Sequence, residues 1–473
     1  MTNLQDIVAV DLGNSSGRVV LAEWNGSQGT LREIYRFPNG TDEVDGHVVW
    51  DMERIWCEVF KGLKVGATKT RGQIESIGLD SWGADFVLVD QAGDLIGLAF
   101  CLRDTRNLAA MERAFTIFSR KRIYEITGIQ LMPVNTLYGL LAHIQQFPDE
   151  WERAKFWLGT AEHLLFCRTG VAVAEYTNAP NSQMVDAVSK TWSRELCEAF
   201  GLSLDKFPPI VPPGTILGKL RPALARKLGL PNTKVVAPAC HDTGSAVAAI
   251  PYAHDNLAFV SSGTWSLVGT VLNAPLISEQ GYQFNITNEG GVGNTIRYLR
   301  NVVGLWLIQE CVREWNKQGY PVTAPQLAER CMGVSMEGPF FDVADEKPFL
   351  APGNMIARIN SALRAKGYAE ENRPAELAGI IFRSLARRYA EVIDAIRKCT
   401  GKPLERLCIV GGGVRNDALN SLAGRSTGLE VVKGSSEATL IGNVAVQIAA
   451  LENTRSVEEI QAIASCLKFL GEN

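Results

Sequence analysis

Short apolar runs separated by small polar turns predict two β-hairpins that lie far apart in the chain. Residues 7–24, IVAVDLGNSSGRVVLAEW, place two apolar runs on either side of a turn rich in glycine and serine. That pattern is typical of a strand, a turn and a second strand. Residues 257–271, LAFVSSGTWSLVGTV, repeat it. The sequence therefore predicts two hairpins with similar turns, one in each half of the chain.

Two further segments combine an apolar strand with a helical pattern. Residues 235–250, VVAPACHDTGSAVAAI, predict a buried strand, a sharp turn at His241-Asp242-Thr243 and a helix rich in alanine and valine. Residues 407–424, LCIVGGGVRNDALNSLAG, predict a strand, a glycine-rich turn and a helix. A hairpin and a strand–turn–helix segment thus occur twice in the same order, which indicates two related α/β halves. A chain of 473 residues also favours two domains.

Helical spacing of apolar residues marks most of the remaining chain. It predicts helices over 51–70, most of 106–200, 376–398, 437–452 and a short stretch after 453. Within the second of these, residues 176–182 are rich in serine, threonine and asparagine and are expected to be extended. The proline-rich residues 207–214, FPPIVPPG, cannot form a helix and are expected to be a rigid extended connector.

Composition and charge narrow the class of protein. Hydrophobic residues make up 46% and charged residues 21%, which is ordinary for a globular protein. A formal net charge of −4 argues against a nucleic-acid or anionic-membrane surface. The ten cysteines show no C-x-x-C spacing and no cluster with histidine, so we expect free, mostly buried thiols. Neither a signal peptide nor an apolar run long enough to span a membrane is evident, and we expect a cytoplasmic protein.

The polar turns carry the candidate chemistry. His241, Asp242 and Thr243 lie at the predicted carboxyl end of a strand, where α/β folds bind ligands. Turns rich in glycine and serine hold phosphate through backbone N–H groups and hydroxyls. A carboxylate between two such turns suggests phosphoryl transfer. The alternatives are that Asp242 caps a helix and that the hairpins have ordinary polar turns.

Other strand ends add to this hypothesis. Asp11 ends the first strand and is placed to hold a magnesium ion through water, and Asp80 ends a later strand in the same way. Arg18 adds a positive charge beside the first turn. The glycines 411–413 would let a nucleotide approach the backbone closely, although a tight turn alone also explains them.

The motifs taken together resemble the FGGY family of carbohydrate kinases. The matching stretches are IVAVDLGNSSGRVVLAEW, SIGLDSWGADFVLVD, ACHDTGSAVAA, SSGTWSLVGT, NITNEGG, YLRNVVGLWLIQE and IVGGGVRNDALN, and they cover nearly the whole chain. Many FGGY kinases carry a DxGTTS-like first loop, where this chain has DLGNSSGR. That departure, with SSGTWS and NEGG, points to the branch of the family that acts on L-rhamnulose.

The resemblance implies a fold and a set of site residues. It implies two ribonuclease-H-like domains, as in actin and hexokinase, over residues 1–250 and 251–473, facing each other across a catalytic cleft. The ATP-binding residues would be Asn14, Ser15, Ser16, Gly17, Arg18, Thr264, Gln309 and Gly412. The sugar-binding residues would be Gly83, His241, Asp242, Thr243 and Asn301, with Asp242 as the proton acceptor.

The implied reaction is ATP-dependent phosphorylation of the C1 hydroxyl of L-rhamnulose, which gives L-rhamnulose 1-phosphate and ADP in L-rhamnose catabolism. ATP and Mg²⁺ would be the cofactors, and no nucleic acid or membrane would be a partner. One alternative is a kinase for another keto-sugar such as L-fuculose, because one sequence does not fix sugar stereochemistry. Another is a non-catalytic ATP-binding protein of the actin-like fold. The His-Asp-Thr turn disfavours the latter, and the oligomeric state stays open.

Overall fold

The chain forms two compact α/β units in the computed structural model, which describes residues 4–70, 72–251, 256–344, 347–350 and 352–471. Unit 1 comprises Met1–Tyr252, Leu272–Arg297 and Thr439–Asn473, and unit 2 comprises Ala253–Val271 and Tyr298–Ala438. The predicted boundary at residue 250 divides the chain into two domains that are continuous in sequence, and it stays a prediction. The compact units are assembled differently, because two later segments join unit 1.

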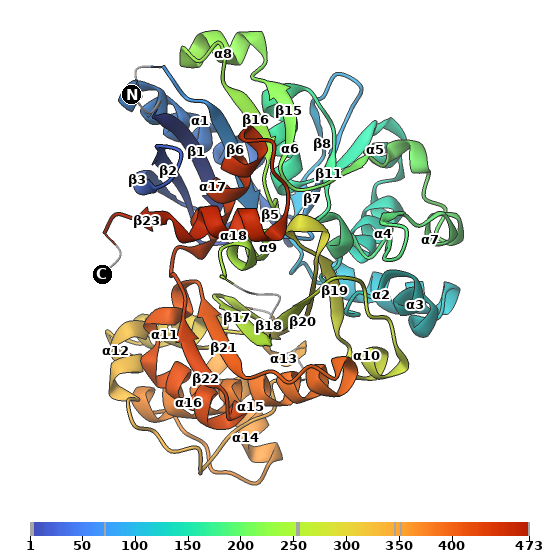
Figure 1. The fold of residues 1–473 in the computed structure, drawn as a ribbon. Helices are drawn as coiled ribbons and strands as arrows, with labels where there is room; N and C mark the ends of the chain where they lie inside the picture. Colours follow the sequence, from blue (N-terminus) through green and yellow to red (C-terminus); the bar gives the residue numbers. More distant parts are fainter. Residues whose placement is uncertain (1–3, 71, 252–255, 345–346, 351, 472–473) are drawn as a thin grey trace. The chain divides into compact units, whose positions relative to one another are not determined.

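The sheet of unit 1 contains seven strands in the order β15-β16-β6-β1-β2-β3-β23 (Figure 1). Their bounds are β1 Gln5–Leu12, β2 Ser16–Trp24, β3 Gly29–Pro38, β6 Ser76–Ser81, β15 Thr215–Lys219, β16 Lys234–Ala237 and β23 Leu467–Phe469. Strands β1 and β2 form the predicted antiparallel hairpin. Strand β6 runs parallel to β1 on one side and to β16 on the other. The carboxyl ends of β1, β6 and β16 therefore meet at one edge of the sheet.

Successive apolar side chains of these strands point to opposite faces of the sheet. Both faces are therefore apolar, and helices cover each of them. Val8 and Val10 of β1 belong to a core with α1 (Met52–Lys69) and α6 (Thr160–Thr169). Ile7 and Ala9 belong to a second core with α9 (Asp242–Ala248), α17 (Ala438–Leu451) and α18 (Val457–Ser465). Helix α1 confirms its prediction: Asp51 caps it, accepting a hydrogen bond from the Arg54 N–H at 2.8 Å.

Helix α17 lies very close to α9, and a glycine allows this approach. A Cβ on Gly442 would lie 1.8 Å from the Ser245 carbonyl oxygen. The same helix contributes polar side chains to the sheet. Gln447 accepts a hydrogen bond from the Ser76 hydroxyl at 2.8 Å, and Asn443 donates one to Asp80 at 2.7 Å. Residues from the far end of the chain therefore complete the interior of unit 1.

The region predicted as mostly helical, 106–200, is helical mainly in its first part. The remaining elements of unit 1 are β4 Thr41–Val44, β5 His47–Trp50, β7 Phe86–Val89, β8 Leu95–Ile96, β9 Ala99–Phe100, α2 Arg106–Ile117, α3 Arg120–Thr127, α4 Thr136–Gln146, α5 Pro148–Arg153, β10 Phe156–Gly159, β11 Ala174–Glu175, η1 Ala179–Ser182, β12 Val185–Asp186, β13 Thr191–Trp192, α7 Arg194–Ala199, η2 Leu204–Lys206, β14 Ile210–Val211, α8 Pro222–Leu228, α10 Glu279–Phe284, β19 Thr287–Gly290 and η3 Val292–Asn294.

Two expectations for this region need correction. Residues 176–182 are not extended throughout, because η1 forms a short 3₁₀ turn with Pro180 in its first positions. Proline is well suited to the start of a helical turn, where no backbone N–H is needed. Residues 156–159 form a strand that the sequence did not reveal, and it pairs with β7. The predicted extended connector is confirmed, since its residues Ile210 and Val211 form β14.

The sheet of unit 2 repeats the arrangement of the first. The strands that lie in unit 2 follow the order β20-β18-β17-β21-β22 (Figure 1), with bounds β17 Leu257–Ser262, β18 Trp265–Leu272, β20 Ile296–Val303, β21 Arg406–Val410 and β22 Glu430–Lys433. The first two residues of β20, Ile296 and Arg297, belong to unit 1. As β1 does in unit 1, β17 pairs antiparallel with its hairpin partner and parallel with a later strand. The prediction of two related α/β halves is therefore confirmed.

Helices complete unit 2. They are α11 Trp306–Lys317, α12 Ala324–Arg330, α13 Lys347–Leu350, α14 Met355–Ala365, α15 Pro374–Thr400, η4 Gly412–Arg415 and α16 Asp417–Thr427. The face predicted for α15 is confirmed, because Leu377, Ile381 and Leu385 are all buried.

All ten cysteines lie in the described part of the chain and are free thiols, six of them buried, as predicted. None of the helices over the described ranges has the length and apolar character needed to cross a bilayer.

Candidate active site

The segment between β16 and α9 places His241 and Asp242 at the carboxyl edge of the sheet of unit 1. His241 has an extended backbone and forms an isolated parallel bridge with Ser81 at the end of β6. His241 occupies the N-cap position, and Asp242 is the first helical residue. The alternative that Asp242 is the helix cap is therefore wrong. Its Oδ1 accepts hydrogen bonds from the N–H of Thr243 at 2.5 Å and the hydroxyl of Thr243 at 3.2 Å.

Three carboxylates from β1, β6 and α9 act on one another in unit 1. Asp11 and Asp80 are direct partners in the parallel register of β1 and β6. Burial, followed by the charges of Asp11 and Asp242, raises the pKa of Asp80 well above its usual value. Desolvation is the largest cause that raises the pKa of Asp242, His241 opposes it, and the charge of Asp11 adds to it. Such a shift prepares a carboxylate to accept a proton.

A cation partner is already present beside these acids. Arg18, on β2, pairs with the Asp11 carboxylate at 2.6 Å. The two residues are also opposite each other in the β1–β2 register. Arg18 therefore lies next to both the first turn and the carboxylate cluster.

Buried polar groups fix the turn that precedes Asp242. The Cys240 N–H donates to Glu175 Oε2 at 2.8 Å, and the His241 N–H donates to Thr177 Oγ1 at 3.2 Å. Burial raises the pKa of Glu175 to about 8. Gly83, a predicted sugar contact, lies against this turn, because a Cβ added to it would be 3.4 Å from the His241 ring. The predicted sugar-binding residues of unit 1 are therefore close together.

The first predicted phosphate loop is a tight turn between β1 and β2. The Gly13 N–H donates to the Ser16 carbonyl at 2.9 Å, and Ser15 at the tip is exposed. Asn14 is half-buried beside it. A Cβ on Gly17 would meet the Phe37 ring at 2.1 Å, so packing alone requires glycine at this position.

Unit 2 holds the other predicted ATP residues and Asn301. The Thr264 carbonyl accepts hydrogen bonds from the N–H groups of Gly304 and Trp306, each at 3.1 Å. Helix α11 starts at Trp306 and carries Gln309. The second hairpin turn therefore lies against the start of the helix that carries Gln309. Asn301 lies on β20 and is half-buried.

Backbone conformation or packing explains two of the three glycines at 411–413, but not the third. Gly411 has a φ of 80°, which favours glycine, and a Cβ on Gly413 would lie 2.0 Å from the Ser262 hydroxyl. Gly412 is exposed, and a Cβ on it would meet nothing within 4 Å. The packing of unit 2 therefore does not explain why residue 412 is a glycine.

Several residues of the site had no assigned role in the sequence. Asp80 had a weak signal, since it ends a strand as Asp11 does. Asn443, which donates to Asp80, lies in a helical pattern without any chemical signal. Arg297 and Glu289 flank His241, and neither their spacing nor their type marks them.

The residues of unit 1 fit a hydrated magnesium ion better than a protein-enclosed metal. Among the described residues, no group of three or more His, Cys, Asp or Glu side chains is arranged to hold a metal ion. Mg²⁺ commonly keeps several waters and is bound by one or two carboxylates and by phosphates. Asp11 is placed to supply such a carboxylate, and a cation there would offset the charge of Asp11, which adds to burial in raising the pKa of Asp80.

Comparison with known proteins identifies the family to which this chain belongs. Residues 7–249 match the N-terminal domain and residues 258–451 the C-terminal domain of the FGGY family of carbohydrate kinases. The chain belongs to this family and is a carbohydrate kinase. Similar relatives are the rhamnulokinases of Oceanobacillus iheyensis, Bacteroides thetaiotaomicron and Bacillus subtilis, at 37%, 38% and 36% identity. The alignments cover 96%, 98% and 96% of this chain and 95%, 94% and 92% of those proteins.

Solved structures confirm the fold. The gluconate kinase of Lactobacillus acidophilus aligns with a TM-score of 0.79 at 17% identity, over 98% of this chain and 92% of that one. The glycerol kinase of Plasmodium falciparum with ADP aligns with a TM-score of 0.78 at 14% identity, over 98% and 92% of the two chains. The predicted α/β fold with two kinase domains is thus the fold of sugar kinases.

Proposed function

We propose that this chain catalyses the ATP-dependent phosphorylation of the C1 hydroxyl of L-rhamnulose to L-rhamnulose 1-phosphate. The observation that carries the proposal is 36–38% identity to rhamnulokinases along nearly the whole chain. The carboxylate cluster of unit 1 supports it, because a sugar kinase needs a base for the attacking hydroxyl. A non-catalytic ATP-binding protein of the same fold would need no such base.

Asp242 is the proton acceptor in this proposal. The C1 oxygen of the sugar attacks the γ-phosphorus of ATP, and the hydroxyl proton moves to the Asp242 carboxylate. The raised pKa of Asp242 favours this transfer, because a base is more effective when its pKa lies closer to the working pH. Thr243 holds Oδ1 of Asp242 through two hydrogen bonds, which orients the carboxylate. The product sugar carries the phosphate, and ADP leaves.

The remaining assignments concern binding. Arg18 and the turn N–H groups would offset negative charge on the phosphates. A magnesium ion held by Asp11 through water would supply further charge neutralisation when bound. The proposed ATP-binding residues are Asn14, Ser15, Ser16, Gly17, Arg18, Thr264, Gln309 and Gly412. The proposed sugar contacts are Gly83, His241, Asp242, Thr243 and Asn301.

The sequence domains are proposed as residues 1–250, with the base and the first phosphate loop, and 251–473, with the adenosine site. A cytoplasmic location without nucleic-acid or membrane partners is proposed from the composition and charge.

A panel of ketoses tests the proposal. ADP release is coupled to a dehydrogenase and measured with L-rhamnulose, L-fuculose and D-xylulose in one buffer containing ATP and Mg²⁺. We expect the largest kcat/KM for L-rhamnulose. A clear preference for another ketose would replace the substrate while leaving the kinase class in place. Absence of sugar-dependent ADP release with the whole panel would contradict the proposed reaction.

A further inference from the structure

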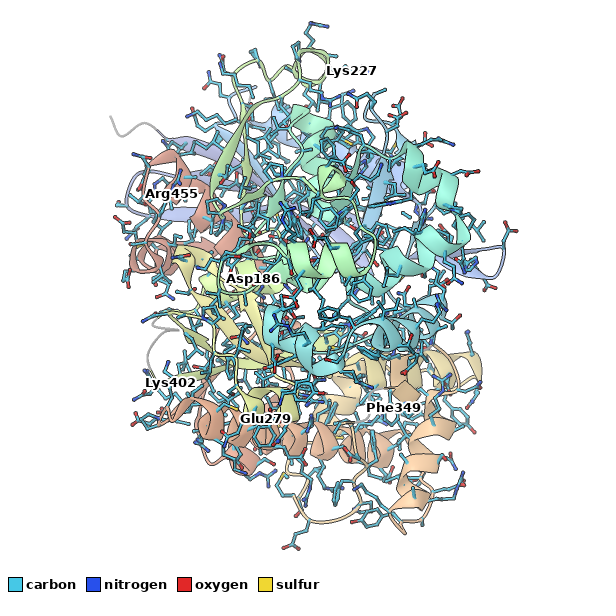
Figure 2. The ribbon with its side chains drawn as sticks, turned by 90° about the vertical axis from the view of Figure 1, so that its right-hand side faces the viewer. Asp186, Lys227, Glu279, Phe349, Lys402 and Arg455 are labelled. Carbon is cyan, nitrogen blue, oxygen red and sulfur yellow. The ribbon has the colours of Figure 1, made fainter. Side chains whose placement is uncertain are left out.

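Arg297 is a fully buried arginine behind the proposed sugar-binding histidine. Basic side chains such as Lys227 and Arg455 are exposed at the surface of unit 1 (Figure 2). Arg297, on β20, has an exposed fraction of 0%, and burial lowers its pKa. Removing a guanidinium from water is costly unless hydrogen bonds and a counter-charge compensate. Its partners therefore indicate what this arginine does.

Arg297 and its partners all belong to unit 1. Its Nε donates to the Gly290 carbonyl at 2.7 Å, and its Nη2 donates to the Thr177 carbonyl at 2.8 Å. Glu289 provides the counter-charge, with Oε2 at 3.1 Å from Nη1. The same Nη2 lies 3.2 Å from Nδ1 of His241. The two backbone carbonyls and Glu289 thus hold the guanidinium in place, and its Nη2 faces the imidazole of His241.

This contact decides which nitrogen of His241 carries the proton. A guanidinium has only donors, so a hydrogen bond with Nη2 requires Nδ1 to be the acceptor. The amide nitrogen of Asn181, 3.1 Å from Nδ1, agrees with that assignment. Oε2 of Glu289 is 3.5 Å from Nδ1, farther than either donor, and it lies closer to Arg297, at 3.1 Å from Nη1. The proton of a neutral His241 ring therefore lies on Nε2.

We propose that Arg297 is a positioning residue that holds His241 in the tautomer with its proton on Nε2. Nε2 lies 3.5 Å from Oδ1 of Asp242, so this tautomer directs an N–H toward the proposed base and toward a sugar oxygen bound beside it. With the opposite tautomer, Nε2 would be a second acceptor next to a carboxylate. The hydrogen bond at one imidazole nitrogen thus sets the chemistry at the other. The catalytic consequence rests on the proposed function, whereas the tautomer does not.

Nitrogen NMR tests the tautomer without any enzymatic assay. The chain has five histidines, so selective ¹⁵N-histidine labelling gives few signals, and a His241→Gln variant identifies those of residue 241. In the full-length wild-type protein near neutral pH, we expect Nδ1 to have the shift of an unprotonated nitrogen and Nε2 that of a protonated one. A proton on Nδ1 would overturn the proposal, whatever the substrate of the enzyme is.

Substitution of Arg297 tests the consequence. Arg297→Lys cannot reach the carbonyls and the imidazole together, so we expect kcat to fall about 10²-fold with little change in the KM for ATP. Arg168→Lys is the matched control, because Arg168 is also fully buried in unit 1 and its guanidinium contacts the Leu164 carbonyl and the Trp56 ring. We expect this control to lower the melting temperature while keeping kcat. Equal losses of kcat in both variants would contradict a specific role for Arg297.

A double variant separates positioning from general structure. Glutamine at position 241 places an amide NH₂ near the position of Nε2 and has no tautomer to fix. Arg297→Lys should therefore change kcat much less in the His241→Gln background than in the wild type. Losses that multiply in the double variant would overturn the proposal. If no ketose is phosphorylated, the proposed function fails, and the NMR measurement still decides the tautomer.

Discussion

The two units place corresponding strands in the same order but end them with different chemistry. In unit 1, the parallel strands β1 and β6 bring Asp11 opposite Asp80. In unit 2, the parallel strands β17 and β21 bring Ser261 opposite Val410. The repeated frame thus supplies equivalent positions, and one copy fills them with two acids where the other has a hydroxyl and an apolar side chain.

The turns that precede α9 and α16 also differ in their side chains. In unit 1, the turn before α9 carries His241 and Asp242, surrounded by buried polar partners. In unit 2, the turn before α16 carries glycines, with open space at Gly412. Acids with raised pKa suit proton transfer, whereas glycines suit close approach of a nucleotide to the backbone. In the proposed mechanism, the residues at the strand ends would divide the two tasks of a kinase between the copies of this fold.

The largest expected effect is a loss of kcat when the proposed base of unit 1 is removed. Asp242→Asn should lower kcat by about 10²–10⁴-fold, because an amide cannot accept the C1 proton. The helix should keep its start, since the N-cap position is His241. The measurement is kcat at saturating ATP and sugar, together with a melting curve and an ATP titration.

Asp90→Asn is the control for Asp242→Asn. Asp90 is also a turn aspartate of unit 1, and it accepts hydrogen bonds from the N–H groups of Ala92 and Gly93. We expect it to leave kcat unchanged. Near wild-type kcat in Asp242→Asn would leave unit 1 without its assigned base.

The next effect concerns the glycines of unit 2. Gly412→Val should weaken ATP binding about 10- to 100-fold, since overpacking a site costs about 1–3 kcal/mol, and should leave folding nearly unchanged. Calorimetric ATP titration and a melting curve measure the two quantities. The contrast is Gly413→Ala, whose Cβ would lie 2.0 Å from the Ser262 hydroxyl and should lower the melting temperature instead. Unchanged ATP affinity in folded Gly412→Val protein would remove Gly412 from the nucleotide site.

The last prediction is the pH dependence of stability that a buried acid gives to unit 1. Asp85 accepts hydrogen bonds from the indoles of Trp50 and Trp82, at 2.6 and 2.7 Å, and burial raises its pKa to about 7. A folded-state pKa above the unfolded value gives stability that is full below about pH 4 and is lost as the pH rises toward about 7.

Comparison with Asp85→Asn isolates this contribution. The variant should lose less free energy of unfolding than the wild type between about pH 5 and about pH 8, by a slope of at most about one proton. Urea unfolding at each pH gives the difference, and all other groups cancel between the two proteins. Parallel pH profiles would show that Asp85 does not titrate in this range.

The parts of the fold that were predictable depend on local patterns. Apolar runs bounded by glycine and serine fixed both hairpins, and helical periodicity fixed α1 and α15, because neighbouring residues determine these elements. Strand β23 was missed because it pairs with β3 across more than four hundred residues of sequence. The 3₁₀ turn at Ala179–Ser182 was missed because its polar composition also suits an extended segment.

The candidate site shows the same division. The motifs placed Asp11 and Asp242 at strand ends, and the structure brings them into one unit. The residues around them are different in kind. Nothing in a helical pattern indicates that Asn443 donates to Asp80, and nothing in a strand pattern indicates that Arg297 is buried against His241. Side-chain partners from distant segments require the fold itself.

The return of residues 439–473 to unit 1 has a consequence for how the protein is made. A ribosome synthesises the whole of unit 2 before it reaches Thr439, where the chain returns to unit 1. Asp80 therefore lacks the hydrogen bond from Asn443 until translation has passed residue 443. Until then, the face of the sheet that α17 and α18 cover is exposed on the nascent chain. An mRNA truncated after the codon for residue 438 would therefore yield a complete unit 2 attached to an unfinished unit 1, with the proposed base on the unfinished part.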